Sequence, residues 1–299
     1  MERFLQYLFD GLSQGSIYAL LALGLVTIYR GSGQFNFAQG EIAMFSAFVA
    51  WWFEGLGIPI WVSVISATIA AFVTGAVIER VIIRPIHHRS AFAVVVAAIG
   101  LFLGINALAP FLWKLKNPEA FQSLFPNEPG DFVNIGGAAW RKENIGVLLV
   151  TLLIAGVVVV LFQRTKLGLA MRAVASNPES APLVGIKTGQ VLMVSWGLAA
   201  AIGAIGGCMV ASVRSNVDSS MMFGVFFSAA AAATLGGFTS LGGAVVCGLF
   251  LGVLENMVAG YAPGIIGQDL KTTVSLLTIL VVLLVRPAGL FGAARAERV

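Results

Sequence analysis

Charged residues are scarce in this chain. Of its 299 residues, 14 are Asp or Glu and 18 are Lys or Arg, so that 11% are charged and 58% are hydrophobic. Soluble domains carry about 25% charged residues. With a mean hydropathy of +0.92, this shortage argues against an ordinary soluble protein and predicts a polytopic membrane protein. The net charge of +4 is modest, and we interpret the cations as topology determinants rather than as a nucleic-acid-binding surface.

Several catalytic and energy-coupling motifs are also missing. The sequence has no G-x-x-x-x-G-K-[ST] phosphate-binding loop, no H-E-x-x-H and no G-x-S-x-G. No catalytic residue is therefore predicted. Asp, Glu, Lys and Arg are absent from the runs 91–113, 144–163, 188–213, 219–254 and 272–285. Because proton-driven carriers place ionisable groups within their spans, we expect any driving energy to come from another subunit.

Candidate metal ligands are few, and no metal site is predicted. His87 and His88 are adjacent, and adjacent residues of a helix do not share a face, so we expect them to form part of a basic patch. Cys208 and Cys247 lie inside apolar runs without metal-binding spacing. They are predicted to be small buried hydrophobic side chains.

Apolar stretches of membrane-spanning character fill the rest of the chain. They predict an all-α polytopic membrane protein with about eight or nine transmembrane helices, or eight crossings and one re-entrant or broken piece. The stretches are 10–29, 37–53, 60–82, 91–113, 144–163, 190–213, 222–237, 241–261 and 272–286. Four glycine pairs spaced by four residues are predicted to serve helix packing: Gly11/Gly15, Gly100/Gly104, Gly203/Gly207 and Gly248/Gly252.

Orientation follows from the distribution of Lys and Arg. With nine crossings, eleven of these cations fall on one side and seven on the other. The positive-inside rule then places the eleven-cation side, with the C-terminus, in the cytoplasm. On the opposite side, the segment 114–143 is rich in Pro, Gly and Asn and is expected to be an extracytoplasmic loop.

The longest cytoplasmic connector, residues 164–187, is here called the coupling segment. It predicts a helix over 167–175, followed by Asn177 as a helix cap with Pro178 and Glu179 in the first turn. A short second helix over 180–184 is expected to end at Gly185. Such capped, cation-flanked helices at a membrane surface suit docking into a groove of a soluble subunit. A plain interfacial linker is the alternative.

Polar residues are expected at three further places. Asn36, Gln39 and Glu41 stand at the start of the second span, where they either cap and pack the helix or line a translocation path or gate. Glu255 and Asn256 either line a cavity or lie near the membrane surface. Thr239 and Ser240 fall in a tight turn or broken helix between two glycine pairs, which is a third candidate for the path.

Several strings resemble the branched-chain amino acid permease family of ABC importers (LivH type). One is GLAMRAVASNPESAPLVGI at 168–186, which is similar to the cytoplasmic coupling loop of that family. The others are GLSQGSIYALLALGL at 11–25, NFAQGE at 36–41, LGGFTSLGGA at 235–244 and VRPAGLFG at 285–292. Together they extend over almost the whole length. The family commonly has His where this chain has Gln39.

The resemblance implies an assembly in the bacterial cytoplasmic membrane. Its other members would be a second homologous permease subunit, two cytoplasmic ATPase subunits and an extracytoplasmic substrate-binding protein, besides membrane lipid. ATP and Mg would be bound by the ATPases, with no cofactor on this chain. The residues implied in ATPase coupling are Gly168, Arg172, Ala173, Asn177, Pro178, Glu179, Ala181 and Gly185.

The function expected from this resemblance is that of a permease subunit, not an enzyme, in an ATP-driven importer of leucine, isoleucine and valine. A related importer for urea, amides or aromatic acids is the first alternative. A stand-alone channel is the second.

Overall fold

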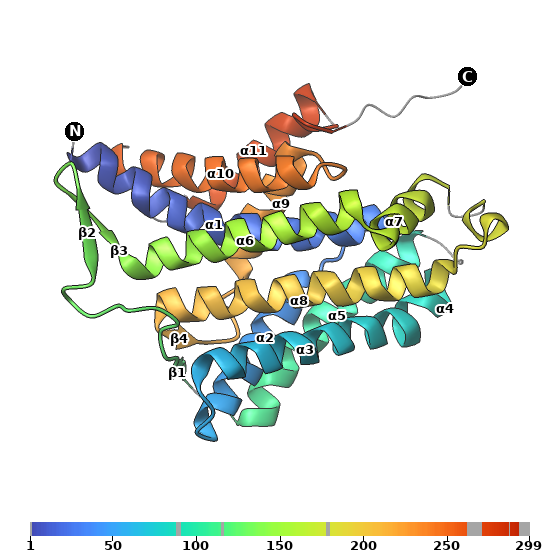
Figure 1. The fold of residues 1–299 in the computed structure, drawn as a ribbon, viewed down its shortest axis with the longest axis horizontal. Helices are drawn as coiled ribbons and strands as arrows, with labels where there is room; N and C mark the ends of the chain where they lie inside the picture. Colours follow the sequence, from blue (N-terminus) through green and yellow to red (C-terminus); the bar gives the residue numbers. More distant parts are fainter. Residues whose placement is uncertain are drawn as a thin grey trace. The chain divides into compact units, whose positions relative to one another are not determined.

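Helices make up nearly all of the regular structure in the computed structural model, which describes residues 2–87, 91–114, 117–177, 180–261, 271–286 and 288–292 (Figure 1). The long helices are α1 (Glu2–Ser32), α2 (Gln39–Gly55), α3 (Ile60–Ile78), α5 (Ala91–Trp113), α6 (Lys142–Arg164), α8 (Thr188–Arg214), α9 (Phe223–Gly236), α10 (Leu241–Tyr261) and α11 (Lys271–Val285). The short elements are the π-helical turn η1 (Glu79–Ile83), α4 (Arg84–His87), α7 (Lys166–Ser176), the 3-10 helix η2 (Ala181–Val184), and strands β1 (Glu119–Ala120), β2 (Phe132–Ile135), β3 (Ala138–Arg141) and β4 (Asn216–Val217).

The predicted fold class, an all-α polytopic membrane protein, is confirmed. Within the described residues, each of the nine predicted apolar stretches contains a helix. In the part of the chain that the structure describes, six helices are long and apolar enough to cross a bilayer: Glu2–Ser32, Ile60–Ile86, Phe92–Trp113, Lys142–Arg164, Thr188–Arg214 and Leu241–Tyr261. Phe223–Gly236 and Thr273–Val285 are shorter apolar helices.

The first helix begins earlier than its hydrophobic run. The apolar stretch starts at residue 10, whereas α1 starts at Glu2. Its mixed first turns are supported by an i,i+4 contact in which Gln6 Nε2 donates to the Asp10 carboxylate at 3.3 Å. Polar pairs at this spacing stabilise a helix in water, so the helix extends beyond the part that hydropathy alone marks.

The segment 114–143, predicted as a loop, contains a β-hairpin. Strands β2 and β3 pair antiparallel, with Phe132 opposite Arg141 and Ile135 opposite Ala138. Gly136 and Gly137 form the two-residue connection with φ of 60° and 87°, the conformation that favours Gly-Gly in tight hairpins. At its base, Lys142 Nζ donates to Asp131 Oδ1 at 2.7 Å, and this hydrogen bond lowers the pKa of the Asp131 carboxyl.

The chain divides into two compact units. Unit 1 comprises residues 1–26, 127–155 and 224–299, and unit 2 comprises residues 27–126 and 156–223. In unit 1, α1 and α10 cross where two of the predicted glycine pairs meet, because a Cβ at Gly15 or Gly252 would clash with the backbone of the opposite helix. Close backbone approach of this kind is typical of glycine-spaced helix pairs in membranes.

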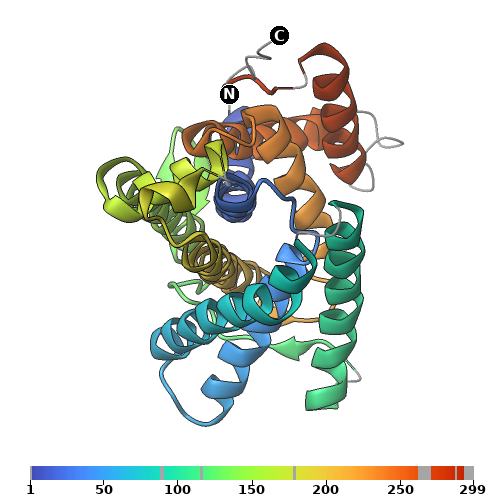
Figure 2. The same ribbon diagram turned by 90° about the vertical axis from the view of Figure 1, so that its right-hand side faces the viewer.

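Unit 2 is built around α2, α3 and α8, which lie side by side in both views (Figures 1 and 2). Their shared core includes the fully buried Trp196 of α8, with Ile42 of α2 and Ile78 of α3. Strands β1 and β4 pair antiparallel and close one end of this unit. Both cysteines are buried and free, as predicted.

The crossing of α1 and α10 can be tested with one methyl group. Gly252→Ala places a Cβ against Gly15, so we expect a loss of about 1–3 kcal/mol of stability from overpacking. Thermal unfolding of the purified protein in detergent measures this loss. Gly100→Ala is the matched control, since a Cβ there meets no described atom within 4 Å. Equal melting of the two variants would contradict the crossing.

Candidate functional site

The coupling segment begins with a capped helix that turns sharply off α6. The Thr165 hydroxyl accepts a hydrogen bond from Gly168 N at 3.1 Å and donates to Leu161 O at 2.6 Å. A Cβ at Gly168 would clash with the carbonyl oxygens of Leu161 and Phe162. Only glycine therefore permits α7 to start this close to the end of α6.

Helix α7 has one buried and one exposed face. Gly168, Met171 and Val174 are buried, at spacings of three residues along one side. Leu169 is 60% exposed, and Arg172 is exposed on the same outward face. Ala173 is half-buried between the two. The helix thus anchors itself with its apolar side and presents a leucine and a cation outward.

The predicted second helix is present as the 3-10 helix η2. The Asn177 side chain accepts a hydrogen bond from Ser180 N at 2.9 Å. However, Asn177 is the C-cap of α7, and the N-cap position of η2 that was predicted for it is occupied by Ser180. Pro178 and Glu179 lie outside the described residues. Ala181 is buried, and Gly185 ends the helix in the left-handed conformation at φ 83°. Leu183 and Val184 are 86% and 75% exposed, although they are large and apolar.

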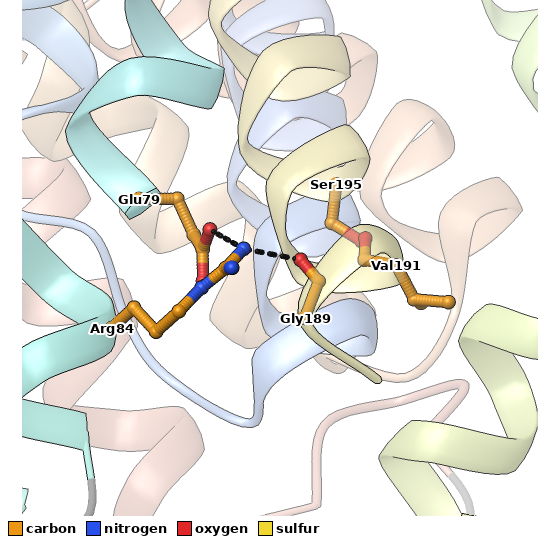
Figure 3. A network of polar contacts seen from close by, with 5 residues as sticks. All are labelled: Glu79, Arg84, Gly189, Val191 and Ser195. Atoms are coloured by element: carbon orange, nitrogen blue, oxygen red, sulfur yellow. Dashed lines mark hydrogen bonds and ion pairs between the residues drawn. The ribbon is translucent and has the colours of Figure 1, made fainter. Parts of the chain in front are cut away.

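Both ends of the coupling segment are tied to helices of unit 2. At the entrance, the Arg30 guanidinium lies over the Phe162 ring at 5.1 Å from its centroid, within the range of a cation–π contact. At the exit, Arg84 donates to the Gly189 carbonyl oxygen in the first turn of α8 (Figure 3). Neither arginine was predicted as a site residue, because contacts between distant helices leave no local pattern.

Asn36 and Gln39 make contacts that stabilise the start of α2. Asn36 Oδ1 accepts from Ala38 N at 3.0 Å, and its Nδ2 donates to Gln39 Oε1 at 3.4 Å. Gln39 Nε2 donates to the Ala199 carbonyl oxygen of α8 at 2.8 Å. Both side chains are fully buried. These contacts favour the capping and packing interpretation, and a role in the path stays a prediction.

Glu41 is joined to α5 by a residue that was not predicted. Asn106 Nδ2 donates to Glu41 Oε2 at 2.9 Å and also reaches the Ser219 carbonyl oxygen at 2.9 Å. Glu41 is 2% exposed and lies in the first turn of α2, where the helix dipole favours a carboxylate. An asparagine in the middle of a charge-free run, such as Asn106, is the pattern that could have identified this partner.

Glu255 lies at the centre of a polar cluster in unit 1. Tyr18 Oη donates to Glu255 Oε2 at 2.6 Å, and Ser228 Oγ donates to Oε1 at 2.9 Å. The Ser275 hydroxyl contacts the same oxygen and lies 2.8 Å from Ser228 Oγ. These residues come from α1, α9, α10 and α11. Glu255 was predicted either to line a cavity or to lie near the membrane surface. It is 1% exposed and therefore lies in the buried interior.

The remaining predicted path residues lie on α10 and in the turn before it. Ser240 caps α10, because its hydroxyl accepts from Gly243 N at 3.0 Å. Thr239 is exposed in the turn between α9 and α10. Asn256 Nδ2 donates to Gly252 O at 2.9 Å, within its own helix. The predicted tight turn is confirmed, since α9 ends at Gly236 and α10 begins at Leu241.

A cavity of 230 Å³ opens in unit 2 between α2, α3 and α5. Its lining is apolar apart from Ser46 and Thr74 and includes Phe45, Ala71 and Leu101. Asn36, Gln39 and Glu41 are not among the residues that line it. The cavity fits an aliphatic group and offers it no charged partner.

The fold and the coupling segment together define an integral membrane protein that exposes short apolar helices beyond its spans. The family model described as "Branched-chain amino acid transport system / permease component" matches residues 7–283. The chain belongs to this family, which confirms the resemblance, and its homologues are ABC transporter permeases rather than enzymes.

Three relatives match along nearly their entire length. The permease protein LivH of the high-affinity branched-chain amino acid transport system of Salmonella typhimurium is 30% identical over 99% of this chain and 98% of its own. LivH of Escherichia coli K12 is 29% identical and BraD of Pseudomonas aeruginosa 28% identical, with the same coverage.

The Glu255 cluster predicts a stability effect for one hydroxyl. Tyr18→Phe removes a donor to a buried carboxylate, and we expect a loss of about 1–2 kcal/mol. Thermal unfolding in detergent measures it. Tyr261→Phe, at a 60% exposed tyrosine of the same unit, is the control and should melt like the unmodified protein. A Tyr18→Phe protein as stable as this control would show that the contact contributes nothing.

Proposed function

We propose that this chain is a permease subunit of an ATP-driven importer that passes leucine, isoleucine and valine across the cytoplasmic membrane. The chain contributes spans and a docking segment, and ATP and Mg act on two separate cytoplasmic ATPase subunits. A second homologous permease and an extracytoplasmic binding protein complete the assembly. The names of the full-length relatives support the substrate class.

The observation that carries the proposal is the exposed apolar surface of the coupling segment. Leu169, Leu183 and Val184 lie on short capped helices outside the spans and are mostly exposed to solvent. Exposed large apolar side chains on both short helices of one connector are typical of a protein interaction site. Arg172 lies on the same face of α7 as Leu169 and is a cation for a carboxylate of the partner, which suits docking into a groove of an ATPase.

In this proposal the chain supplies no covalent chemistry. Closure of the ATPases displaces the coupling segment, and α6 and α8, which begin or end at it, move between two access states. The predicted path residues Asn36, Gln39, Glu41, Thr239, Ser240, Glu255 and Asn256 would act by polar contacts within the two units. The C-terminus is placed in the cytoplasm by the same orientation that puts the coupling segment there.

Substrate class is tested by reconstituted uptake. Liposomes that contain the permeases and ATPases, supplied with the binding protein, are given a panel of radiolabelled leucine, isoleucine, valine, urea, an aliphatic amide and phenylalanine. We expect ATP-dependent uptake of the three aliphatic amino acids. Uptake of urea or amide alone would reassign the substrate, and uptake without ATP or ATPases would indicate a channel.

The docking role of the coupling segment is tested by charge reversal. Arg172→Glu places a carboxylate on the outward face of α7, and we expect at least a tenfold loss of uptake, about 1.4 kcal/mol of interaction, with normal membrane insertion. Co-purification of the ATPases with the permease measures the lost contact directly. Arg3→Glu, which reverses an exposed arginine near the start of α1, is the control. Unimpaired uptake by Arg172→Glu would remove Arg172 from the docking surface.

A further inference from the structure

A single arginine joins the end of α3 to the beginning of α8 (Figure 3). Arg84 donates from Nε to Glu79 Oε1 at 3.2 Å and from Nη2 to Glu79 Oε2 at 2.7 Å. Nη2 also donates to the Gly189 carbonyl oxygen at 2.5 Å. Glu79 is 1% exposed and Arg84 is 37% exposed. We call these three residues the Arg84 bridge.

The π-helical turn η1 builds this bridge. Arg84 N–H donates to the Glu79 carbonyl oxygen, which is the i+5 to i bond of a π-turn. On an α-helix, residues three and four apart are neighbours and residues five apart are not. The π-turn therefore places Arg84 over Glu79. The two residues are joined by a main-chain hydrogen bond and by hydrogen bonds between their side chains. Single π-turns inside α-helices occur frequently at functional sites.

The packing of α3 on α8 is close and apolar, and the Arg84 bridge adds directed hydrogen bonds to it. The two helices approach through small residues: a Cβ at Gly75 would clash with Trp196 O, and a Cβ at Gly197 would touch Phe72. Such dispersion contacts are individually weak but large in sum, and they are less directional than hydrogen bonds. A bidentate arginine–carboxylate pair has a fixed geometry. The Arg84 guanidinium makes such a pair with Glu79 and also donates to the Gly189 carbonyl oxygen of α8.

The bridge lies where the coupling segment ends. Gly189 is two residues beyond Lys187, in the first turn of α8. Six residues further along α8, Ser195 lies against Gly31 at the end of α1, where a Cβ would clash with the serine side chain. The start of α8 is thus held by α1 through packing and by η1 through the charged pair, and both contacts lie within unit 2.

We propose that Arg84 is a positioning residue that fixes the position of α8 along α3, so that movement of the coupling segment is passed to the spans instead of being lost as sliding. This inference rests on the proposed function, since it needs an ATPase that moves the segment. Arg84 itself contacts neither substrate nor nucleotide in this role. It acts through Glu79 and the Gly189 carbonyl oxygen.

The test compares ATP hydrolysed per leucine imported in the reconstituted complex. Arg84→Lys keeps the charge but cannot bond Glu79 with two prongs and reach Gly189 at once. The double variant Glu79→Gln/Arg84→Gln removes both charges, so that no buried carboxylate is left unpaired. Arg80→Gln, at an exposed arginine of the same π-turn, is the matched control. Hydrogen exchange of the amides at the start of α8 is measured on the same samples.

We expect the ratio of ATP to leucine to rise about fivefold or more in the double variant, which is the lower range of coupling between sites. Arg84→Lys should give a smaller rise and Arg80→Gln none. Hydrogen exchange at the start of α8 should be faster in the double variant and in Arg84→Lys, and unchanged in Arg80→Gln. If uptake and hydrolysis fall together at an unchanged ratio, Arg84 is merely structural and the inference is overturned while the proposed function stands. If the unmodified complex imports no leucine, the proposed function is wrong and the inference falls with it.

Discussion

Hydrocarbon offers no hydrogen bonds, and this property of the surrounding membrane governs how the chain folds. Backbone groups are satisfied inside helices, and the few buried polar side chains have to meet one another. The three fully buried carboxylates discussed above follow this constraint. Glu41 bonds to Asn106, Glu79 to Arg84 and Glu255 to Tyr18 and Ser228. Each contact joins different helices or different turns, so the polar groups specify how the apolar elements are arranged.

The sequence allowed prediction of those features that depend on neighbouring residues. Hydrophobic run length located every long helix among the described residues, and it placed α5 at the predicted residues 91–113. The helix of the coupling segment and the Gly185 terminus were also predicted, since capping depends on residues three or four apart. The N-cap of η2 is Ser180 and not the predicted Asn177. The hairpin at 132–141 was missed, although two adjacent glycines between alternating strands would have indicated it.

Contacts between remote helices could not be predicted from one sequence. Tyr18 and Glu255 are 237 residues apart, Arg84 and Gly189 are 105 apart, and Asn106 and Glu41 are 65 apart. The predictions identified Glu41 and Glu255 but not their partners, because a partner is decided by which helix faces pack together. The π-turn at Glu79–Ile83 was missed for a related reason. Its composition is that of an ordinary apolar helix end, and only the i+5 bond distinguishes it.

The position of Ser275 in the chain has a consequence for biosynthesis. A ribosome makes α1, α9 and α10 before α11, so that Glu255 enters the membrane when Tyr18 and Ser228 already exist and Ser275 does not. During this interval the carboxyl group has two of the three hydroxyl partners that it has in the finished fold. Arrival of α11 supplies the third. Helix α11 therefore completes the hydrogen bonding of a group that is already inserted, and its docking completes the polar cluster around Glu255.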